Sequence, residues 1–427
     1  MARGLCFRFI CSRFRSRKII YFISVIIATI YMISDLSYIH QNVETISLSQ
    51  PNEGSVLHKT SRENFTTKEL RYPHVTNKST TVTEGIHVDW RIGVEKKFPW
   101  VIRQKYLVNY YIYIARTLNA EHERYKSASL VFLHHNKAAG TTVKTCLSVL
   151  ASAETLRVGP VMASQTRVSF HTSEVRRNRY ANSRIFMGGY SFGVCDELNL
   201  TDRSCSYFTF LRDPYERIIS SYEYCKRARS DQLCSALNAN EVTLKQWAKH
   251  QGNFFFRQLL FEPGFCQRHY DSFIDIDSEL HDDKWSSRNK GSLSCWFREK
   301  LILQNLTTIT DRKLLLWYAL DKLTSWFAVI GLAEEYELSM QLLEGAYGLP
   351  FNKMCGRMKR NYNLYQQSNE TDSTKTQTVM EMKNELMADN DVKETLYYDL
   401  QIYEKAKDIF RQQKESYFEL HGEHNRQ

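Results

Sequence analysis

The sequence predicts an α/β protein in which a largely parallel β-sheet is flanked by helices. From residue 130 onward, short runs rich in β-branched and aromatic residues alternate with stretches of helical periodicity. Two of these runs lead through a tight turn directly into a helix start, as strands do in parallel β-α units. The composition agrees, because 43% hydrophobic residues with only 7 Pro and 17 Gly in 427 residues exclude a fibrous or low-complexity chain.

The N-terminus predicts a membrane anchor. Ile19 to Ser34 carries no charge and follows six basic residues, with no acidic residue in the first 18 positions. Such a run spans a thin bilayer when its flanks extend it, and the basic flank keeps the N-terminus cytosolic. We therefore expect a cytosolic tail over 1–18 and a transmembrane signal anchor over 19–36. A cleaved signal peptide is the alternative, but no Ala-x-Ala site follows.

Residues 37–97 are expected to form a disordered, glycosylated stem, and 98–427 the folded lumenal domain. Ser and Thr make up 13 of the 39 residues between Thr45 and Thr83, where apolar residues show no period. Five sequons follow the anchor, as a lumenal location requires. Their acceptors are Asn64, Asn77, Asn199, Asn305 and Asn369.

Cysteines also indicate an oxidising compartment. Eight of the ten cysteines follow the anchor, an even number that suits disulfide formation. Cys225 with Cys234, and Cys266 with Cys295, are near enough in sequence for local disulfides. Zinc is not expected, because the chain has no Cys-x-x-Cys pair.

The elements of the folded domain follow in order. A dense apolar pattern predicts a packed helix from Tyr106 to Leu118, and another amphipathic helix is predicted from Leu396 to Ile409. Four strands are predicted: Leu130 to His134, Arg184 to Met187, Tyr207 to Leu211 and Phe327 to Gly331.

The first chemical motif is HHNKAAGTT, which joins a strand to a helix. Its small residues allow backbone N–H groups to approach an anion, and a helix N-terminus favours negative charge. Lys137 adds a positive charge, while Thr141 and Thr142 can cap the helix or donate hydroxyl protons. The lysine precedes Gly140, unlike in a Walker A loop, so a phosphate-type anion is indicated but a nucleotide kinase is not. An ordinary strand-to-helix turn is the alternative.

The second motif, RDPYERIIS, again delivers residues to a helix start. Asp213 fits the N-cap and Glu216 the third helical position, which together predict a capping box. Arg212 would project beside the helix N-terminus, and Arg217 and Ser220 are three residues apart on one helical face. Arginine with a hydroxyl group at a helix start is typical of a phosphate clamp. An ordinary capped helix would leave Arg212 and Ser220 without a role.

Together the motifs resemble the nucleotide-binding signatures of Golgi carbohydrate sulfotransferases, in particular the heparan sulfate 2-O- and galactose sulfotransferase-like group. These are type II membrane enzymes that use 3′-phosphoadenosine-5′-phosphosulfate (PAPS). The similarity runs from about Ser129 to Phe410 and implies a P-loop-like sulfotransferase fold that needs no metal. It assigns the 5′-phosphosulfate to Lys137, Ala138, Ala139, Gly140, Thr141 and Thr142, and the 3′-phosphate to Arg212 and Ser220. Lys137 would also be catalytic, by neutralising charge on the leaving phosphate.

One departure from the family concerns the base. Members that modify uronic acids often carry His-Gly-His before an apolar strand, and the comparable stretch here is Met187-Gly-Gly-Tyr. His171, after a short β-like run, is therefore the expected catalytic base, with Glu174 and Glu197 as reserves. A catalytically inactive glycan-binding or nucleotide-binding relative is one alternative. A glycosyltransferase that holds Mn²⁺ with Asp275 and Asp277 is another, although the acidic residues around these aspartates favour a solvated acidic loop.

The charge distribution restricts the partners. The chain has a net charge of +10, but six positive charges belong to the cytosolic flank, so the remainder carries only +4. This argues against nucleic acid. The resemblance implies a glycan acceptor instead, and three basic clusters are candidates to contact it. They are Arg176, Arg177 and Arg179; Lys226, Arg227 and Arg229; and Arg357, Lys359 and Arg360.

Overall fold

The structure is a computed structural model that divides into two compact units, Met1–Thr83 and Glu84–Gln427. All residues described below belong to the second unit. They are 90–101, 106–117, 119–161, 180, 182–189, 191–192, 194, 204–228, 231, 233–234, 237–261, 303–304, 306–358 and 372–424. The predicted tail and anchor lie outside them, and none of the helices in these ranges is long and apolar enough to cross a membrane.

The centre of the fold is a five-stranded sheet of order β2-β3-β1-β4-β5, in which every neighbouring pair is parallel. The predicted α/β class with a parallel sheet flanked by helices is therefore confirmed. The strands are β1 (Ser129–Leu133), β2 (Val158–Val161), β3 (Ile185–Gly188), β4 (Cys205–Leu211) and β5 (Val329–Leu332). The sequence did not predict β2, whose residues VGPV contain proline, a residue that sheets tolerate at an edge.

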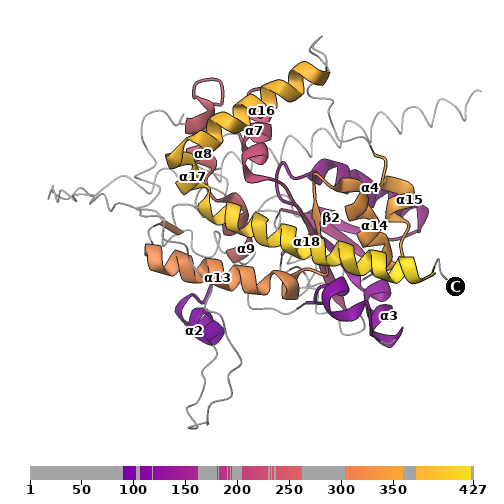
Figure 1. Cartoon of the computed structure of the whole chain (residues 1–427). Helices are drawn as coiled ribbons and strands as arrows, with labels where there is room; N and C mark the ends of the chain where they lie inside the picture. The colour runs from indigo at the N-terminus through magenta and orange to yellow at the C-terminus, as the bar shows by residue number, and fades with distance from the viewer. Residues whose placement is uncertain are drawn as a thin grey trace, which may run out of the picture. The chain divides into compact units, whose positions relative to one another are not determined.

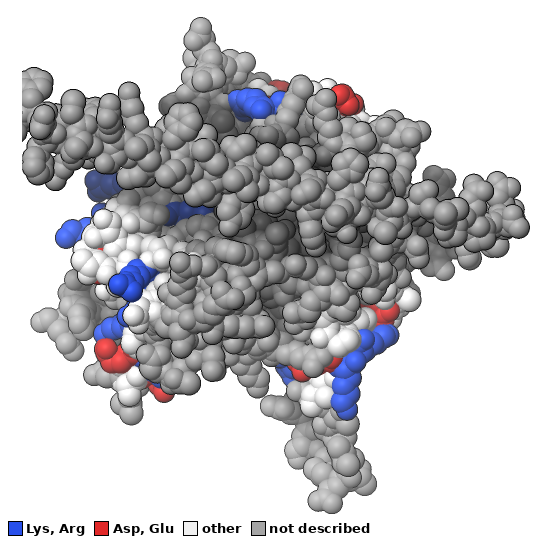
Figure 2. Space-filling view, turned by 180° about the vertical axis from the view of Figure 1, so that it is seen from behind, with Lys and Arg blue, Asp and Glu red and all other residues white. Residues whose placement is uncertain are grey.

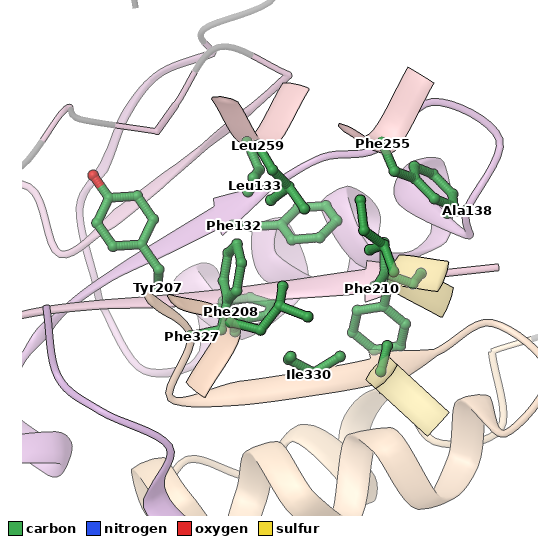
Figure 3. Packing of buried hydrophobic residues seen from close by; sticks show 14 of the residues in the cluster. Phe132, Leu133, Ala138, Tyr207, Phe208, Phe210, Phe255, Leu259, Phe327 and Ile330 are labelled. Atoms are coloured by element: carbon green, nitrogen blue, oxygen red, sulfur yellow. The ribbon is translucent and has the colours of Figure 1, made fainter. Parts of the chain in front are cut away.

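Aromatic side chains of the central strands form the middle of the core (Figure 3). The ring of Phe132 on β1 stacks on Phe208 of β4 at 5.2 Å and meets Phe210 edge-on at 6.3 Å. All residues of β1 and β3 are buried, as expected for parallel strands covered on both faces. The loops that follow β1 and β3 therefore leave from a fully buried part of the sheet.

One group of helices contains α3 (Asn119–Ser127), α4 (Gly140–Ala153), α14 (Tyr336–Tyr347) and α15 (Phe351–Cys355). Helix α15 packs on α4 and on α14, and α14 packs on α3. A disulfide between Cys146 of α4 and Cys355 of α15 links two parts of the chain that are 209 residues apart. This bond holds the helix that follows β1 against the helices that follow β5.

A second group contains α9 (Phe254–Leu260), α13 (Ile309–Trp326) and the long α18 (Tyr397–His424) (Figure 1). The helix predicted from Leu396 to Ile409 lies within α18 and is confirmed, apart from its first residue. Helix α2 (Trp90–Lys97) packs on α13, with its Arg91 paired to Asp321 at 2.6 Å. Residues 90–97, which the sequence places at the end of the stem, thus form part of the folded unit.

The helix predicted from Tyr106 to Leu118 is wrong. The segment forms only a π-helical turn, η1 (Tyr110–Ile114). The backbone N–H groups at its start donate to distant parts of the chain. Asn109 N–H donates to the carbonyl oxygen of Thr324 (2.7 Å), and Tyr110 N–H donates to that of Ala328 (2.9 Å). These tertiary hydrogen bonds replace the helical ones that the apolar pattern predicted.

A third group contains α7 (Pro214–Cys225), which follows β4, with α8 (Leu244–Gln251), α16 (Asp372–Ala388) and α17 (Asn390–Thr395). Helices α8 and α16 pack on α7, and α17 packs on α8 and α16. The predicted Cys225–Cys234 disulfide is confirmed and closes the loop after α7. Cys205 is also disulfide-bonded, whereas Cys266 and Cys295 lie outside the described residues.

Candidate functional site

The two motifs meet at the carboxyl edge of the sheet. Because β1 and β4 are parallel neighbours, the loops that follow them leave the sheet side by side. Hydrogen bonds extend the strand pairing by one residue, from His134 N–H to Gly188 O (3.0 Å) and from Ala333 N–H to Leu211 O (2.8 Å). This edge is where open parallel sheets bind ligands.

The loop after β1 has an unusual backbone. Lys137 and Ala139 adopt left-handed conformations, with φ of 67° and 60°, which non-glycine residues adopt rarely and at a cost of about 1–3 kcal/mol each. Ala139 is the N-cap of α4, and no side chain caps this helix. The first backbone N–H groups of α4 are therefore suited to bind an anion.

Gly140 is required by close packing at the start of α4. A Cβ atom at this position would lie 1.7 Å from Cδ2 and 1.8 Å from Nε2 of His134. Burial lowers the pKa of His134 to about 3, so its ring is neutral near pH 7. A neutral ring over the helix start fills the space that any other residue at position 140 would need.

Lys137 lies beside an aromatic ring at the edge of this loop. Its Nζ is 3.9 Å from the centroid of the Tyr224 ring, and the Tyr224 hydroxyl donates to Asp231 Oδ2 at 2.7 Å. Burial and the neighbouring Arg212 lower the pKa of Lys137 to about 8, while Asp231 opposes the shift. The ammonium group is thus fixed in position and poorly hydrated, so a phosphate group would bind it strongly.

Arg212 connects the two motifs. Its Nη1 donates to the backbone oxygen of Lys137 at 3.5 Å, and its Nη2 pairs with Glu216 Oε2 at 3.3 Å. The guanidinium therefore lies next to the loop after β1 and beside the N-terminus of α7. Both predicted cationic residues occupy one edge of the sheet.

The capping box predicted for α7 is only half correct. Asp213 is the N-cap and accepts from Glu216 N–H at 3.0 Å, as predicted. The N–H of Asp213 donates instead to Glu334 Oε1 at 2.9 Å, so the Glu216 carboxylate does not cap the helix. A residue from the loop after β5 has taken the place that the local pattern assigned to Glu216.

Arg217 and Ser220 are three residues apart on α7, as predicted, but they differ in burial. Its side chain is fully buried, and its guanidinium lies 4.9 Å from the Phe254 ring and 5.4 Å from the Phe255 ring of α9. Ser220, the seventh residue of α7, is half-buried. Of this pair, only Ser220 is placed to contact a ligand.

Gln258 of α9 forms hydrogen bonds to the loops that follow β1 and β3. Its amide nitrogen donates to His134 O at 3.0 Å and to Gly189 O at 2.8 Å, and its oxygen accepts from the ring of His135. Burial lowers the pKa of His135 to about 3, which keeps the ring neutral near pH 7. The ends of β1 and β3 are thus tied to one side chain.

Helix α9 is itself held by α18 through reciprocal caps. The buried Asp399 carboxylate accepts from the N–H groups of Phe254, Phe255 and Phe256 at 2.8 to 3.2 Å. In return, Asn253 Oδ1 accepts from Asp399 N–H at 3.1 Å. This pairing fixes the helix that supports the site.

The other predicted site residues are placed as follows. Ala138 is fully buried in the core, and Ala139 is the partly exposed N-cap of α4. Thr141 is exposed and Thr142 is buried, both in the first turn of α4. His171, Glu174, Glu197, Asp275 and Asp277 lie outside the described residues, as do the five sequon asparagines.

Four further residues adjoin the site and were missed by sequence reasoning: Tyr224, Asp231, Glu334 and Lys383. Each reaches the site through tertiary packing and belongs to no local motif.

Within the described part of the chain, no group of His, Cys, Asp and Glu is arranged to hold a metal ion. The visible basic side chains lie at several separate points (Figure 2).

A comparison with protein families agrees with this geometry, whereas a search of curated proteins gives no significant match. The model of the sulfotransferase family matches residues 124–405, about two thirds of the chain and the whole region that carries both motifs. The chain therefore belongs to the sulfotransferase family, and its activity class is that of a transferase.

Proposed function

We propose that this protein transfers the sulfuryl group of PAPS to a hydroxyl group of a glycan in the Golgi lumen. The observation that carries the proposal is the meeting of Lys137 and Arg212, which follow different strands, at one sheet edge, where Arg212 Nη1 lies 3.5 Å from the backbone oxygen of Lys137. Two cations beside two helix N-termini suit a ligand with separate phosphate groups. The apolar N-terminal run with its basic flank and the five later sequons support a single-pass type II protein.

Each site residue has a role in this proposal. The acceptor oxygen forms a bond to sulfur as the bond from sulfur to the 5′-phosphate oxygen breaks, and Lys137 neutralises the charge on that oxygen. Thr141, Thr142 and the N-terminus of α4 hold the 5′-phosphate. Arg212 and Ser220 hold the 3′-phosphate. His171 remains our candidate for the base that removes the acceptor proton.

A thermal-shift assay tests the nucleotide. The whole protein is heated with adenosine 3′,5′-bisphosphate (PAP), the nucleotide product, or with UDP plus Mn²⁺. We expect PAP alone to stabilise it, by about 2.7 kcal/mol at a hundredfold excess over Kd. Stabilisation by UDP plus Mn²⁺ alone would favour a glycosyltransferase and refute the proposal.

Transfer of labelled sulfate from PAPS to a panel of glycans tests the reaction. We expect Lys137→Ala to abolish transfer in a protein that remains folded, and Arg212→Ala to weaken PAP binding. Lys249→Ala is a matched control, because this lysine pairs with Asp391 on the surface between α8 and α17. PAP binding by the wild-type protein without transfer to any glycan would indicate an inactive relative.

A further inference from the structure

The carboxylate of Glu216 lies at the proposed 3′-phosphate end of the site, where it would repel a phosphate. Because Glu334 accepts the hydrogen bond from Asp213 N–H, Glu216 is released from the cap and its Oε2 lies 3.3 Å from Arg212 Nη2. Asp213, the N-cap, adds a second carboxylate at the same helix end. An arginine held between such neighbours is a poor phosphate ligand unless their charge is neutralised.

Lys383 supplies the neutralising charge. It comes from α16, which passes beside α7 (Figure 1). Its Nζ lies 3.1 Å from Asp213 Oδ2 and 3.2 Å from Glu216 Oε1. Although burial opposes ionisation of each group, the two carboxylates raise the pKa of Lys383, and Arg212 and Lys383 lower that of Glu216.

The four groups form a chain of alternating charge: Asp213, Lys383, Glu216 and Arg212. Lys383 binds one oxygen of Glu216, and Arg212 binds the other. All four side chains are 19–28% exposed, so the pairs are shielded from solvent more than ordinary surface pairs. When Arg212 turns to a phosphate, Lys383 can keep Glu216 neutralised.

We propose that Lys383 is a specificity-determining residue that gives the site its preference for nucleotides with a 3′-phosphate. This inference rests on the proposed function, since it assumes that Arg212 binds that phosphate. Lys383 acts through Glu216 and Asp213 and needs no contact with the nucleotide. Removing it leaves the carboxylates of Asp213 and Glu216 without their lysine partner beside Arg212, which should weaken binding of a 3′-phosphate and leave ligands without this group unaffected.

The test compares the Kd of PAP with that of adenosine 5′-monophosphate, which lacks the 3′-phosphate, by calorimetry on the whole protein. We expect Lys383→Met to weaken PAP binding about tenfold and to leave the monophosphate unchanged. Lys383→Arg should keep the wild-type preference. Adding Glu216→Gln to Lys383→Met should restore most of the PAP affinity, and Lys249→Met is the control for loss of a surface lysine.

The outcomes separate this inference from the proposed function. A wild-type protein that binds PAP no better than the monophosphate would overturn both. A wild-type preference that Lys383→Met leaves intact would overturn the role of Lys383 alone. Equal weakening of both nucleotides, or failure of Glu216→Gln to rescue, would show that Lys383 only supports the fold. Glu216→Gln alone should not weaken PAP binding, and this check does not depend on the folding of Lys383→Met.

Discussion

The pKa of Lys137 predicts how nucleotide binding depends on pH. Burial, with Arg212 nearby, lowers this pKa from 10.5 to about 8 in the free protein. A bound phosphate favours the charged ammonium and raises the pKa again. PAP binding therefore takes up a proton above pH 8, and the affinity should fall as the pH rises.

The size of the effect follows from the fraction of Lys137 that is protonated. With a pKa of about 8, this fraction falls from about 0.9 at pH 7 to about 0.1 at pH 9, so the affinity for PAP should fall about tenfold. A lysine with the ordinary pKa would stay almost fully protonated from pH 7 to pH 9, and the affinity for PAP would hardly change. Tenfold corresponds to about 1.4 kcal/mol of binding free energy.

Calorimetric titration with PAP at pH 7 and pH 9 measures this ratio. Lys137→Arg is the matched variant, because arginine stays charged at both pH values. We expect its two affinities to be equal, whatever their absolute value. The reasoning is refuted if wild-type affinity is the same at both pH values, or if Lys137→Arg shows the same loss.

Three further predictions concern the supporting structure. Gly140→Ala should lower the free energy of unfolding in urea by about 1–3 kcal/mol and weaken PAP binding, because the added Cβ collides with His134. Gly93→Ala is the control, since nothing lies within 4 Å of a Cβ atom there. Unchanged PAP affinity in Gly140→Ala would contradict the packing argument. Opening the Cys225–Cys234 bond by double substitution to serine should cost about 2–3 kcal/mol of unfolding free energy, and an unchanged denaturation midpoint would disprove it. Asp399→Ala should cost about 3 kcal/mol and speed hydrogen exchange at the start of α9, since three N–H groups lose their acceptor; unaltered exchange there would refute the capping role.

Local patterns were sufficient for most of the strands and for the residues of both motifs. Four of the five strands follow from short apolar runs, because period and β-propensity are properties of adjacent residues. Asp213 was identified as an N-cap because its acceptor role involves an N–H group only three residues away. The short Cys225–Cys234 loop was predictable for the same reason.

Patterns failed where the partner comes from a distant part of the chain. The helix predicted over η1 is displaced by hydrogen bonds to residues more than 200 positions away. Arg217 has helical spacing to Ser220, yet the rings of α9 bury it. The neighbouring residues in the sequence do not indicate such a distant partner. The sequence therefore predicted neither the hydrogen bonds of η1 nor the burial of Arg217.

The sequence by itself determined the α/β class, the two strand-to-helix junctions and the positive charges of Lys137 and Arg212, since these depend on residues within a few positions of one another. Only the tertiary structure decided which groups surround those charges. Glu334 replaces Glu216 in the cap, Tyr224 packs on Lys137, and Lys383 neutralises the acidic end of α7. The physical reason is that electrostatic interactions and burial depend on distance in space, and a parallel sheet brings together segments that are far apart in the chain.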